Sequence, residues 1–181
     1  EPRHFPPRAS VPGRVERVAK DAALLDGVYE TFASRYTGTL VRTPEWWERR
    51  VFVKPGLAAV YYNGEGKPEG YLLYEVKERT MSVHEWVSVS EEARLGLWRF
   101  AADHDSMADK LTMTVPADDP LPFLLPDPRI KQEVVPYFMS RIVDVEGFLA
   151  QYPFEPGDGE DAVMLAVEDE HAPWNRGVFR L

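Results

Sequence analysis

The spacing of apolar residues predicts helices at the start of the chain. An amphipathic helix over residues 15–36 follows from apolar side chains recurring at steps of three and four: Val15, Val18, Ala22, Leu25, Val28, Phe32 and Tyr36. Gly38 is a natural C-terminal stop for that helix. A second, short helix is predicted from Thr43 to Arg50, because a capping threonine precedes Pro44 and an acidic first turn.

Strand patterns follow in the middle of the chain. Residues 57–62, 70–76 and 81–89 are rich in β-branched and aromatic residues, and a Gly/Pro-containing turn at 63–68 separates the first two. These runs predict an antiparallel β-meander. In the third strand, alternation predicts one face formed by Met81, Val83, Glu85, Val87 and Val89, and an opposite face formed by Ser82, His84, Trp86 and Ser88.

The next third of the sequence alternates between helix and strand signals. Ser90 is a good N-cap for a helix whose predicted buried stripe contains Ala93, Leu97, Phe100 and Ala101. The later elements predicted are a strand at 110–115, a short helix at 117–125, a strand at 134–145 interrupted at Pro136, and a helical turn at 146–152.

Composition shifts divide the chain into three parts. Residues 1–13 are rich in proline and basic side chains and predict a linker, and residues 14–152 form the first domain. A proline- and glycine-containing break at 153–159 predicts that residues 153–181 open a second domain, with strands at 162–167 and 177–181. Because the sequence starts at Glu1 and closes on a strand pattern, we expect it to be a piece of a longer protein.

Bulk composition narrows the classes of function. A net charge of −9 and a pI near 5.0 disfavour nucleic acid and anionic membranes as partners and favour a cationic ligand. The chain has no cysteine, which excludes disulfides, zinc–thiolate sites and cysteine nucleophiles. It also has no apolar run of 18 residues and no secretory signal pattern, so we expect a cytoplasmic protein.

Few residues form a pattern with recognisable chemistry. Asp103-His104-Asp105 could suggest a metal site, but consecutive residues point in different directions, and a histidine near a helix C-terminus more often meets the helix dipole. The remaining histidines have no ligand spacing, and no serine-hydrolase elbow or P-loop is present. The candidates for a substrate cleft are Trp46, Trp47, Asp118, Asp119 and Asp144.

Each candidate has a structural alternative. Trp46 and Trp47 more often divide into one core and one surface side chain, and Asp118-Asp119 more often serves as an N-cap and turn. For Asp144 the sequence leaves two interpretations open, a substrate contact or an ion pair with Arg141. The sequence therefore assigns no catalytic, cofactor-binding or metal-binding residue.

The order of elements is the layout of the GNAT fold, an α+β fold with a mixed, mostly antiparallel sheet flanked by helices. In that fold the loop after the fourth strand holds the pyrophosphate of coenzyme A on backbone N–H groups, usually through Arg/Gln-x-x-Gly-x-Gly/Ala. Here residues 88–96 read SVSEEARLG, with no glycine before the helix and with Glu91 and Glu92 in its first turn. Two carboxylates there would repel phosphate, so the sequence predicts a GNAT-like domain without its cofactor loop.

Several phrases in order resemble the middle of the Eis (enhanced intracellular survival) family of acetyltransferases. They are YTGTLVR at 36–42, EWW at 45–47, GYLLY at 70–74, LWRF at 97–100, DDPL at 118–121, DPR at 127–129 and RIVDV at 141–145. The resemblance covers roughly residues 14–152, and PWN at 173–175 resembles the start of the family's last domain.

The resemblance implies a domain order and an activity. Members of the family have an acetyl-CoA-binding GNAT domain, a GNAT-like domain without the cofactor loop, and a domain resembling sterol carrier proteins. By resemblance this chain is the second part with the opening hairpin of the third, and it lacks both the loop and the C-terminal carboxylate that acts as general base. The family acetylates amines such as aminoglycosides or lysines and assembles as hexamers.

Two hypotheses of different class stay open. In one, the chain walls the substrate cleft and provides oligomer contacts in an acetyl-CoA-dependent N-acetyltransferase and is inactive alone. In the other, it is a non-enzymatic interaction or ligand-binding module with a degenerate GNAT fold; a GNAT that binds coenzyme A unconventionally is a weaker third. A cofactor-loop motif upstream of Glu1 would favour the enzyme.

Overall fold

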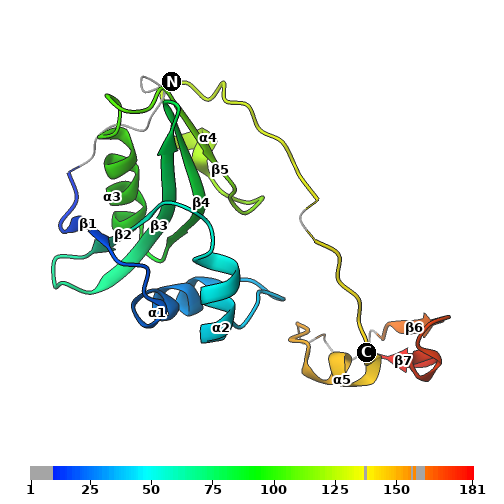
Figure 1. The fold of residues 1–181 in the computed structure, drawn as a ribbon. Coiled ribbons are helices and arrows are strands. Elements are labelled where there is room, and N and C mark those ends of the chain that lie inside the picture. The colour runs from blue at the N-terminus through cyan, green and yellow to red at the C-terminus, as the bar shows by residue number, and fades with distance from the viewer. Residues whose placement is uncertain (1–9, 137, 156, 158–161) are drawn as a thin grey trace. The chain divides into compact units, whose positions relative to one another are not determined.

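A computed structural model of the chain describes residues 10–136, 138–155, 157 and 162–181 (Figure 1). It divides into two compact units, Glu1–Glu133 and Val134–Leu181. The sequence places this division later, between residues 152 and 153. Of the predicted linker 1–13, residues 1–9 lie outside the described part, whereas Val11 packs against the core of the first unit.

The first unit is built on a five-stranded sheet in the order β1-β2-β3-β4-β5. The strands are β1 (Arg14–Val18), β2 (Leu57–Tyr62), β3 (Pro68–Lys77), β4 (Thr80–Ser88) and β5 (Lys110–Met113). All neighbours are antiparallel except β4 and β5, which run parallel. The predicted fold class, a mixed and mostly antiparallel sheet flanked by helices, is confirmed.

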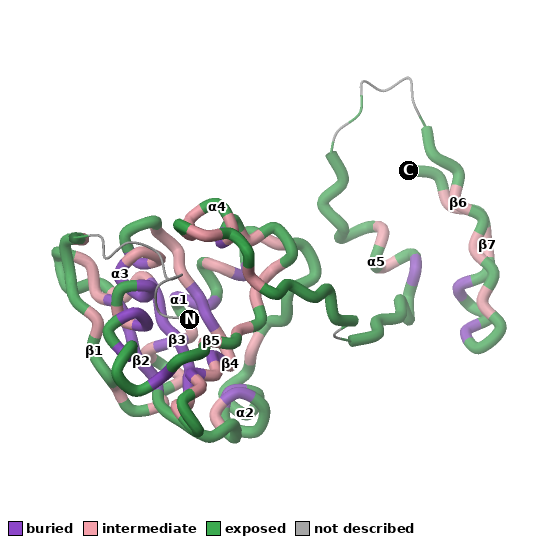
Figure 2. The backbone as a smooth tube through the Cα atoms, turned by 90° about the horizontal axis from the view of Figure 1, so that it is seen from above, coloured by how far each residue is buried: buried purple, intermediate pink, exposed green. Residues whose placement is uncertain are grey.

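Helices cover both faces of this sheet and enclose two apolar cores (Figures 1 and 2). On one face lie α1 (Ala22–Ala33), α2 (Pro44–Trp46) and its π-helical continuation η2 (Trp47–Val51). On the other face lies α3 (Glu91–Ala102), and the short α4 (Leu121–Leu124) follows β5. Residues 57–62 are buried on both faces along most of β2, because each face of the sheet has its own helix layer.

The first predicted helix is wrong over its opening turns. Residues 14–18 pair with β2 in antiparallel register, from Arg14 opposite Tyr62 to Val18 opposite Ala58. The helix begins only after Asp21, whose Oδ1 accepts a hydrogen bond from the N–H of Ala23 at 2.9 Å. Val15 and Val18 happen to stand three residues apart, which continues the helical spacing, although they belong to an edge strand.

A bulge in β4 corrects the predicted faces of that strand. Leu73 pairs with Glu85 and Tyr74 with Val83, so His84 has no opposite residue. The extra residue reverses the alternation: Met81, Val83 and Trp86 face the α3 core, while Val87 faces the α1 core. The alternation in the sequence is regular through the bulge and therefore assigns Trp86 and Val87 to the wrong faces.

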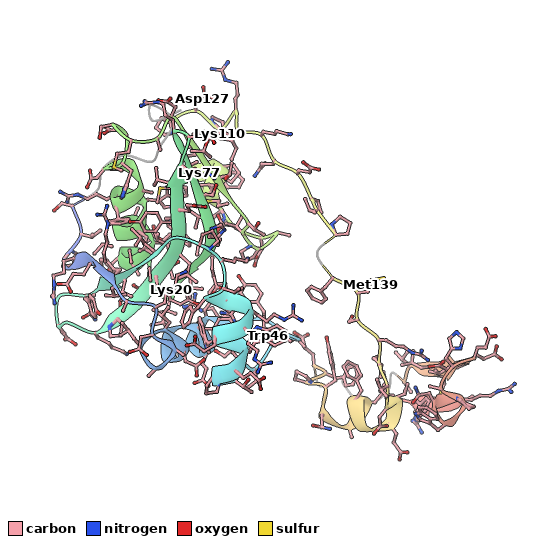
Figure 3. All side chains as sticks on the ribbon, viewed as in Figure 1. Lys20, Trp46, Lys77, Lys110, Asp127 and Met139 are labelled. Carbon is pink, nitrogen blue, oxygen red and sulfur yellow. The ribbon has the colours of Figure 1, made fainter. Side chains whose placement is uncertain are left out.

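The second unit contains α5 (Val145–Gln151), β6 (Met164–Val167), the 3-10 turn η3 (Pro173–Asn175) and β7 (Gly177–Arg180). Strands β6 and β7 form the predicted hairpin, with Met164 opposite Arg180 and Val167 opposite Gly177. Within the described residues of this unit, 134–143 contain no strand, so the strand predicted at 134–145 is wrong. The apolar side chains of the described residues in 134–143 are exposed, Met139 to 99% (Figure 3).

Candidate functional site

A pocket opens in the first unit where β4 and β5 separate. Their pairing ends at Val83 opposite Met113, yet β4 continues to Ser88. Beyond that point a hollow of about 220 Å³ lies between the end of β4, the start of α3, the end of α1 and the segment after β5. It is lined by Phe32, Arg35, Tyr36, Trp86, Ser88, Arg94, Val115, Pro116, Asp118, Asp119 and Pro120.

Two arginines supply positive charge to this pocket. Arg35 donates to the carbonyl of Val89 at 2.6 Å and, over a longer 3.5 Å, to the carbonyl of Ser88. Arg94 forms a two-point ion pair with Glu91, in which Nε lies 2.8 Å from the carboxylate. Its Nη1 is buried and has no hydrogen-bond partner, which leaves one guanidinium donor unsatisfied.

Two carboxylates stand in the segment after β5. Tyr36 donates from its hydroxyl to Asp118 at 3.4 Å, a long contact that leaves the exposed Asp118 available to other groups. Burial and the nearby charge of Asp118 raise the pKa of Tyr36, so this hydroxyl is a donor at neutral pH. Asp119 is partly committed, because its Oδ1 accepts from the N–H of Leu121 at 2.9 Å.

The start of α3 does not have the features of a phosphate cradle. Ser90 accepts from the N–H of Ala93 at 3.1 Å and donates to Glu69 at 2.8 Å, so its hydroxyl is fully used as a cap. Glu91 and Glu92 are exposed in the first turn. A pyrophosphate here would therefore meet two carboxylates instead of a loop of free backbone N–H groups.

Two aromatic rings pack together between β4 and α3. Trp86 of β4 and Trp98 of α3 are both buried, and their ring centroids lie 4.8 Å apart. The capped and acidic start of α3 thus does not fit the pyrophosphate of coenzyme A.

The five residues singled out from the sequence lie in different places. Trp47 is 1% exposed and donates its indole N–H to Asp26 at 2.7 Å, so it is a core residue and not part of a cleft wall. Trp46 is 38% exposed on α2 (Figure 3). The guanidinium of Arg50 lies over its ring. Only Asp118 and Asp119 line the pocket.

Asp144 belongs to the second unit, where it caps α5. Its Oδ1 accepts from the N–H of Gly147 at 2.9 Å, which is the N-cap geometry. Arg141, the ion-pair partner that the sequence left open for it, is paired with Asp169 instead.

Three residues that line the pocket were not predicted as site residues: Arg35, Trp86 and Arg94. The bulge in β4 and the separation of β4 from β5, which bring them to the pocket, leave no local signal in the sequence.

A second polar cluster lies on the α1 face of the sheet. Arg42, in the loop between α1 and α2, forms a two-point ion pair with Glu85 of β4, at 2.7 and 3.0 Å. Its guanidinium lies 3.7 Å from the ring centroid of Tyr29 and 4.6 Å from that of Trp47. Tyr71 also donates to Glu85, and burial together with this carboxylate raises the pKa of Tyr71 well above its ordinary value.

The described residues contain neither a cluster of metal-ligating side chains nor a membrane-spanning helix. Among them, no three His, Asp or Glu side chains are grouped as a metal site would require. His104 is buried and places Nδ1 2.8 Å from the carbonyl of Phe100, so it meets the end of α3 as expected. In the same part of the chain no helix combines the length and hydrophobicity needed to cross a membrane.

Two known families match successive parts of the chain. The family model described as "Acetyltransferase (GNAT) domain" matches residues 38–142, and that described as "Sterol carrier protein domain" matches residues 145–181. The first match alone covers more than half of the chain.

Curated relatives come from Streptomyces. An uncharacterised N-acetyltransferase of Streptomyces griseus is 25% identical over 87% of this chain, and one of Streptomyces coelicolor is 27% identical over 96%. The chain spans only 42% and 47% of those two proteins, respectively.

Solved structures also match most of this chain but less than half of their own length. A probable N-acyltransferase of unknown function from Enterococcus faecalis superposes with a TM-score of 0.84 at 31% identity, over 95% of this chain and 45% of the other. Eis1 from Mycobacterium abscessus gives 0.73 at 29% identity, over 99% and 48%. The match to both continues from the first unit into the second.

Proposed function

Because this chain belongs to the GNAT acetyltransferase family, we propose that it is the cofactor-free part of an acetyl-CoA-dependent N-acetyltransferase that acts on amines. In this proposal the chain forms a wall of the substrate cleft and provides oligomer contacts, and it is inactive alone. The acetyl transfer itself, attack of a neutral amine on the thioester carbonyl, takes place on residues outside this chain.

One observation carries the proposal: the first turn of α3. The anion site of the fold requires backbone N–H groups at this helix start, and here the Ser90 cap and two carboxylates occupy it. Electrostatic repulsion from Glu91 and Glu92 opposes the binding of a pyrophosphate at this helix start.

Similarity to Eis1 supports an Eis-like arrangement as the finer version of this proposal. The likeness covers almost the whole chain and includes both units. This chain also joins a GNAT domain to a sterol-carrier-like domain, in the order that the resemblance implies. The names of the relatives specify transfer to nitrogen, and the net charge of −9 suits cationic acceptors such as aminoglycosides or lysine side chains. Cytoplasmic location and assembly into hexamers belong to the same proposal.

Calorimetric titration of acetyl-CoA into the 181-residue chain tests the proposal, with the full-length Streptomyces griseus relative as comparison. We expect no heat of binding from this chain and saturable binding by the relative. Tight binding by this chain would refute the proposal and would make α3 the first place to search for a catalytic site.

A non-enzymatic ligand-binding or interaction module is the second candidate. The pocket beyond the end of the β4–β5 pairing favours it, because charged side chains of both signs line this pocket. If the longer relative also fails to bind acetyl-CoA, this second function is the better one.

A further inference from the structure

We propose that His104 makes the attachment of the edge strand β1 to the end of α3 sensitive to pH. A neutral imidazole at His104 holds the guanidinium of Arg17 in β1, and a protonated imidazole releases it. This device is separate from the acetyl transfer proposed above and does not depend on it.

His104 lies where three elements of the first unit meet. It follows the end of α3 and is buried, with its ring edge-on to those of Phe100 in α3 and Tyr74 in β3, at centroid distances of 4.7 and 5.5 Å. Arg17 reaches the same ring from β1 and places Nη2 3.1 Å from Nε2 of His104. The other ring nitrogen, Nδ1, lies 2.8 Å from the carbonyl of Phe100. Both nitrogens of the imidazole therefore have a partner in the protein.

The chemistry of these two partners fixes the protonation state of the ring. The carbonyl of Phe100 can only accept a hydrogen bond, so Nδ1 carries a proton. The guanidinium of Arg17 can only donate, so Nε2 must offer its lone pair. Both hydrogen bonds exist together only when His104 is neutral and has its proton on Nδ1.

A second proton on the ring removes the contact with Arg17 and keeps the one with Phe100. The doubly protonated imidazole has no acceptor left, and its positive charge would stand beside that of the guanidinium. The other ionisable groups here are Tyr74, whose hydroxyl accepts from Nε of Arg17 at 2.9 Å, and Asp103 and Asp105, which flank His104 in the chain. Protonation thus leaves His104 on α3 and separates it from β1.

The contact matters for β1 because this strand lies at the edge of the sheet. Among the described strands it pairs with β2 alone, where Arg17 stands opposite Ala59. Val15, two residues earlier and on the same face of the strand, packs against the core beneath α3. Loss of the bond to His104 removes a hydrogen bond of a charged group between β1 and α3, so we expect β1 to open more often in acid.

NMR of the 181-residue chain tests both states of the ring. At about pH 8, long-range ¹H–¹⁵N spectra should show His104 as the neutral form protonated on Nδ1. Between about pH 8 and about pH 5, the range in which histidine changes charge, the protection factors of the β1 amides against hydrogen exchange should fall by about tenfold. A proton on Nε2 at the higher pH, or constant protection of β1 over this range, would overturn the proposal.

Variants assign the response to this one contact. Arg17→Met removes the donor, so the protection of β1 should be lower by about tenfold at both ends of the pH range and should no longer depend on pH. His104→Gln provides an acceptor that does not titrate, so the pH response should likewise disappear.

The matched control is His84→Gln, because His84 is the other histidine among the described residues of the first unit. Burial lowers the pKa of His84, which makes this residue the alternative source of a response to acid. It lies at the bulge of β4, so His84→Gln should keep the pH response of β1. A response that persists in His104→Gln or in Arg17→Met, or one that disappears in His84→Gln, would show that the Arg17–His104 contact is not the device.

Discussion

Asn175 accepts a hydrogen bond on its side-chain oxygen from the backbone N–H of Val145, at 3.0 Å and within the interior of the second unit. The same turn also binds the preceding residues, because the indole N–H of Trp174 donates to the carbonyl of Val143 at 2.8 Å. These side chains hold backbone groups at the entry to α5 that would otherwise need a strand or water. The side chains of PWN at 173–175 therefore stabilise the backbone at the start of α5.

Replacing Asn175 should loosen the entry to α5. Asn175 is 2% exposed, so Asn175→Ala leaves the Val145 N–H buried without an acceptor and should cost about 1–3 kcal/mol. Hydrogen exchange of the Val145 amide, followed by NMR, measures the effect directly. Gln151→Ala, which removes an exposed side-chain contact in the same helix, is the control and should leave that amide protected. Unchanged exchange of the Val145 amide in Asn175→Ala would contradict this stabilising role of Asn175.

Asp169 should make the second unit sensitive to acid. The Arg141 guanidinium beside it, supported by the N–H groups of His171 and Ala172, lowers the pKa of Asp169 from 3.8 to about 2. Because the pKa is lower in the folded state, the stabilisation is complete above about pH 3.8 and is lost as the pH falls through 2.

Unfolding of the second unit between pH 5 and pH 2, monitored by amide exchange, checks this expectation. In Asp169→Asn the pH-dependent part of the stability should disappear, and the unit should be less stable at neutral pH. A variant with the same acid profile as the wild type would show that another carboxylate is responsible.

Removing only one partner of the Arg42–Glu85 ion pair should lower the free energy of unfolding strongly. Both side chains are largely buried, at 13% and 19% exposure, so Arg42→Met leaves the Glu85 carboxylate without its charge partner. We expect a loss of about 3–5 kcal/mol in the free energy of unfolding, measured with urea.

The double variant Arg42→Met with Glu85→Leu separates the charge from the packing. Because neither side then retains an unpaired charge, it should recover part of the lost stability. Arg79→Gln, which breaks an exposed pair with Asp109, is the matched control and should cost about 0–1 kcal/mol. Equal losses in Arg42→Met and Arg79→Gln would contradict the importance of burial.

Local signals in the sequence explain which elements were predicted correctly. Helix α3 was predicted because Ser90 caps it and apolar residues repeat at helical spacing, and the structure confirms the cap and buries Ala93 and Leu97. The meander was predicted from its turn at 63–68, where the Asn63 side chain accepts from the N–H of Glu65 and Lys67.

The features that sequence reasoning missed depend on distant partners. The strand β1 forms because β2, more than forty residues later, provides its hydrogen bonds, and the bulge at His84 is visible only in the register with β3. The pocket depends on this bulge, which turns Trp86 toward α3, and on the separation of β4 from β5, which exposes the pocket lining. Asp118 was a candidate by charge alone, whereas Arg94 had no signal beyond its i,i+3 relation to Glu91.

Replacing each of two helical glycines by alanine should change the stability of the first unit in opposite directions. Gly96 in α3 faces the ring of Tyr61, and a Cβ at this position would lie 2.5 and 2.6 Å from two of its ring carbons. Tyr61 is fully buried and its hydroxyl is bonded to the carbonyl of Pro12, so the ring has little freedom to move. Gly27 in α1 has no atom within 4 Å of the same position.

Gly27→Ala should therefore stabilise the first unit by about 0.5–1 kcal/mol, the ordinary gain of alanine over glycine in a helix. In Gly96→Ala the same gain is outweighed by overpacking of about 1–3 kcal/mol, so a net loss is expected. Urea unfolding of the two variants beside the wild type measures both effects with the same chemical change. Stabilisation by Gly96→Ala would mean that α3 can move away from β2 at little cost, because only such a shift makes room for the added methyl group.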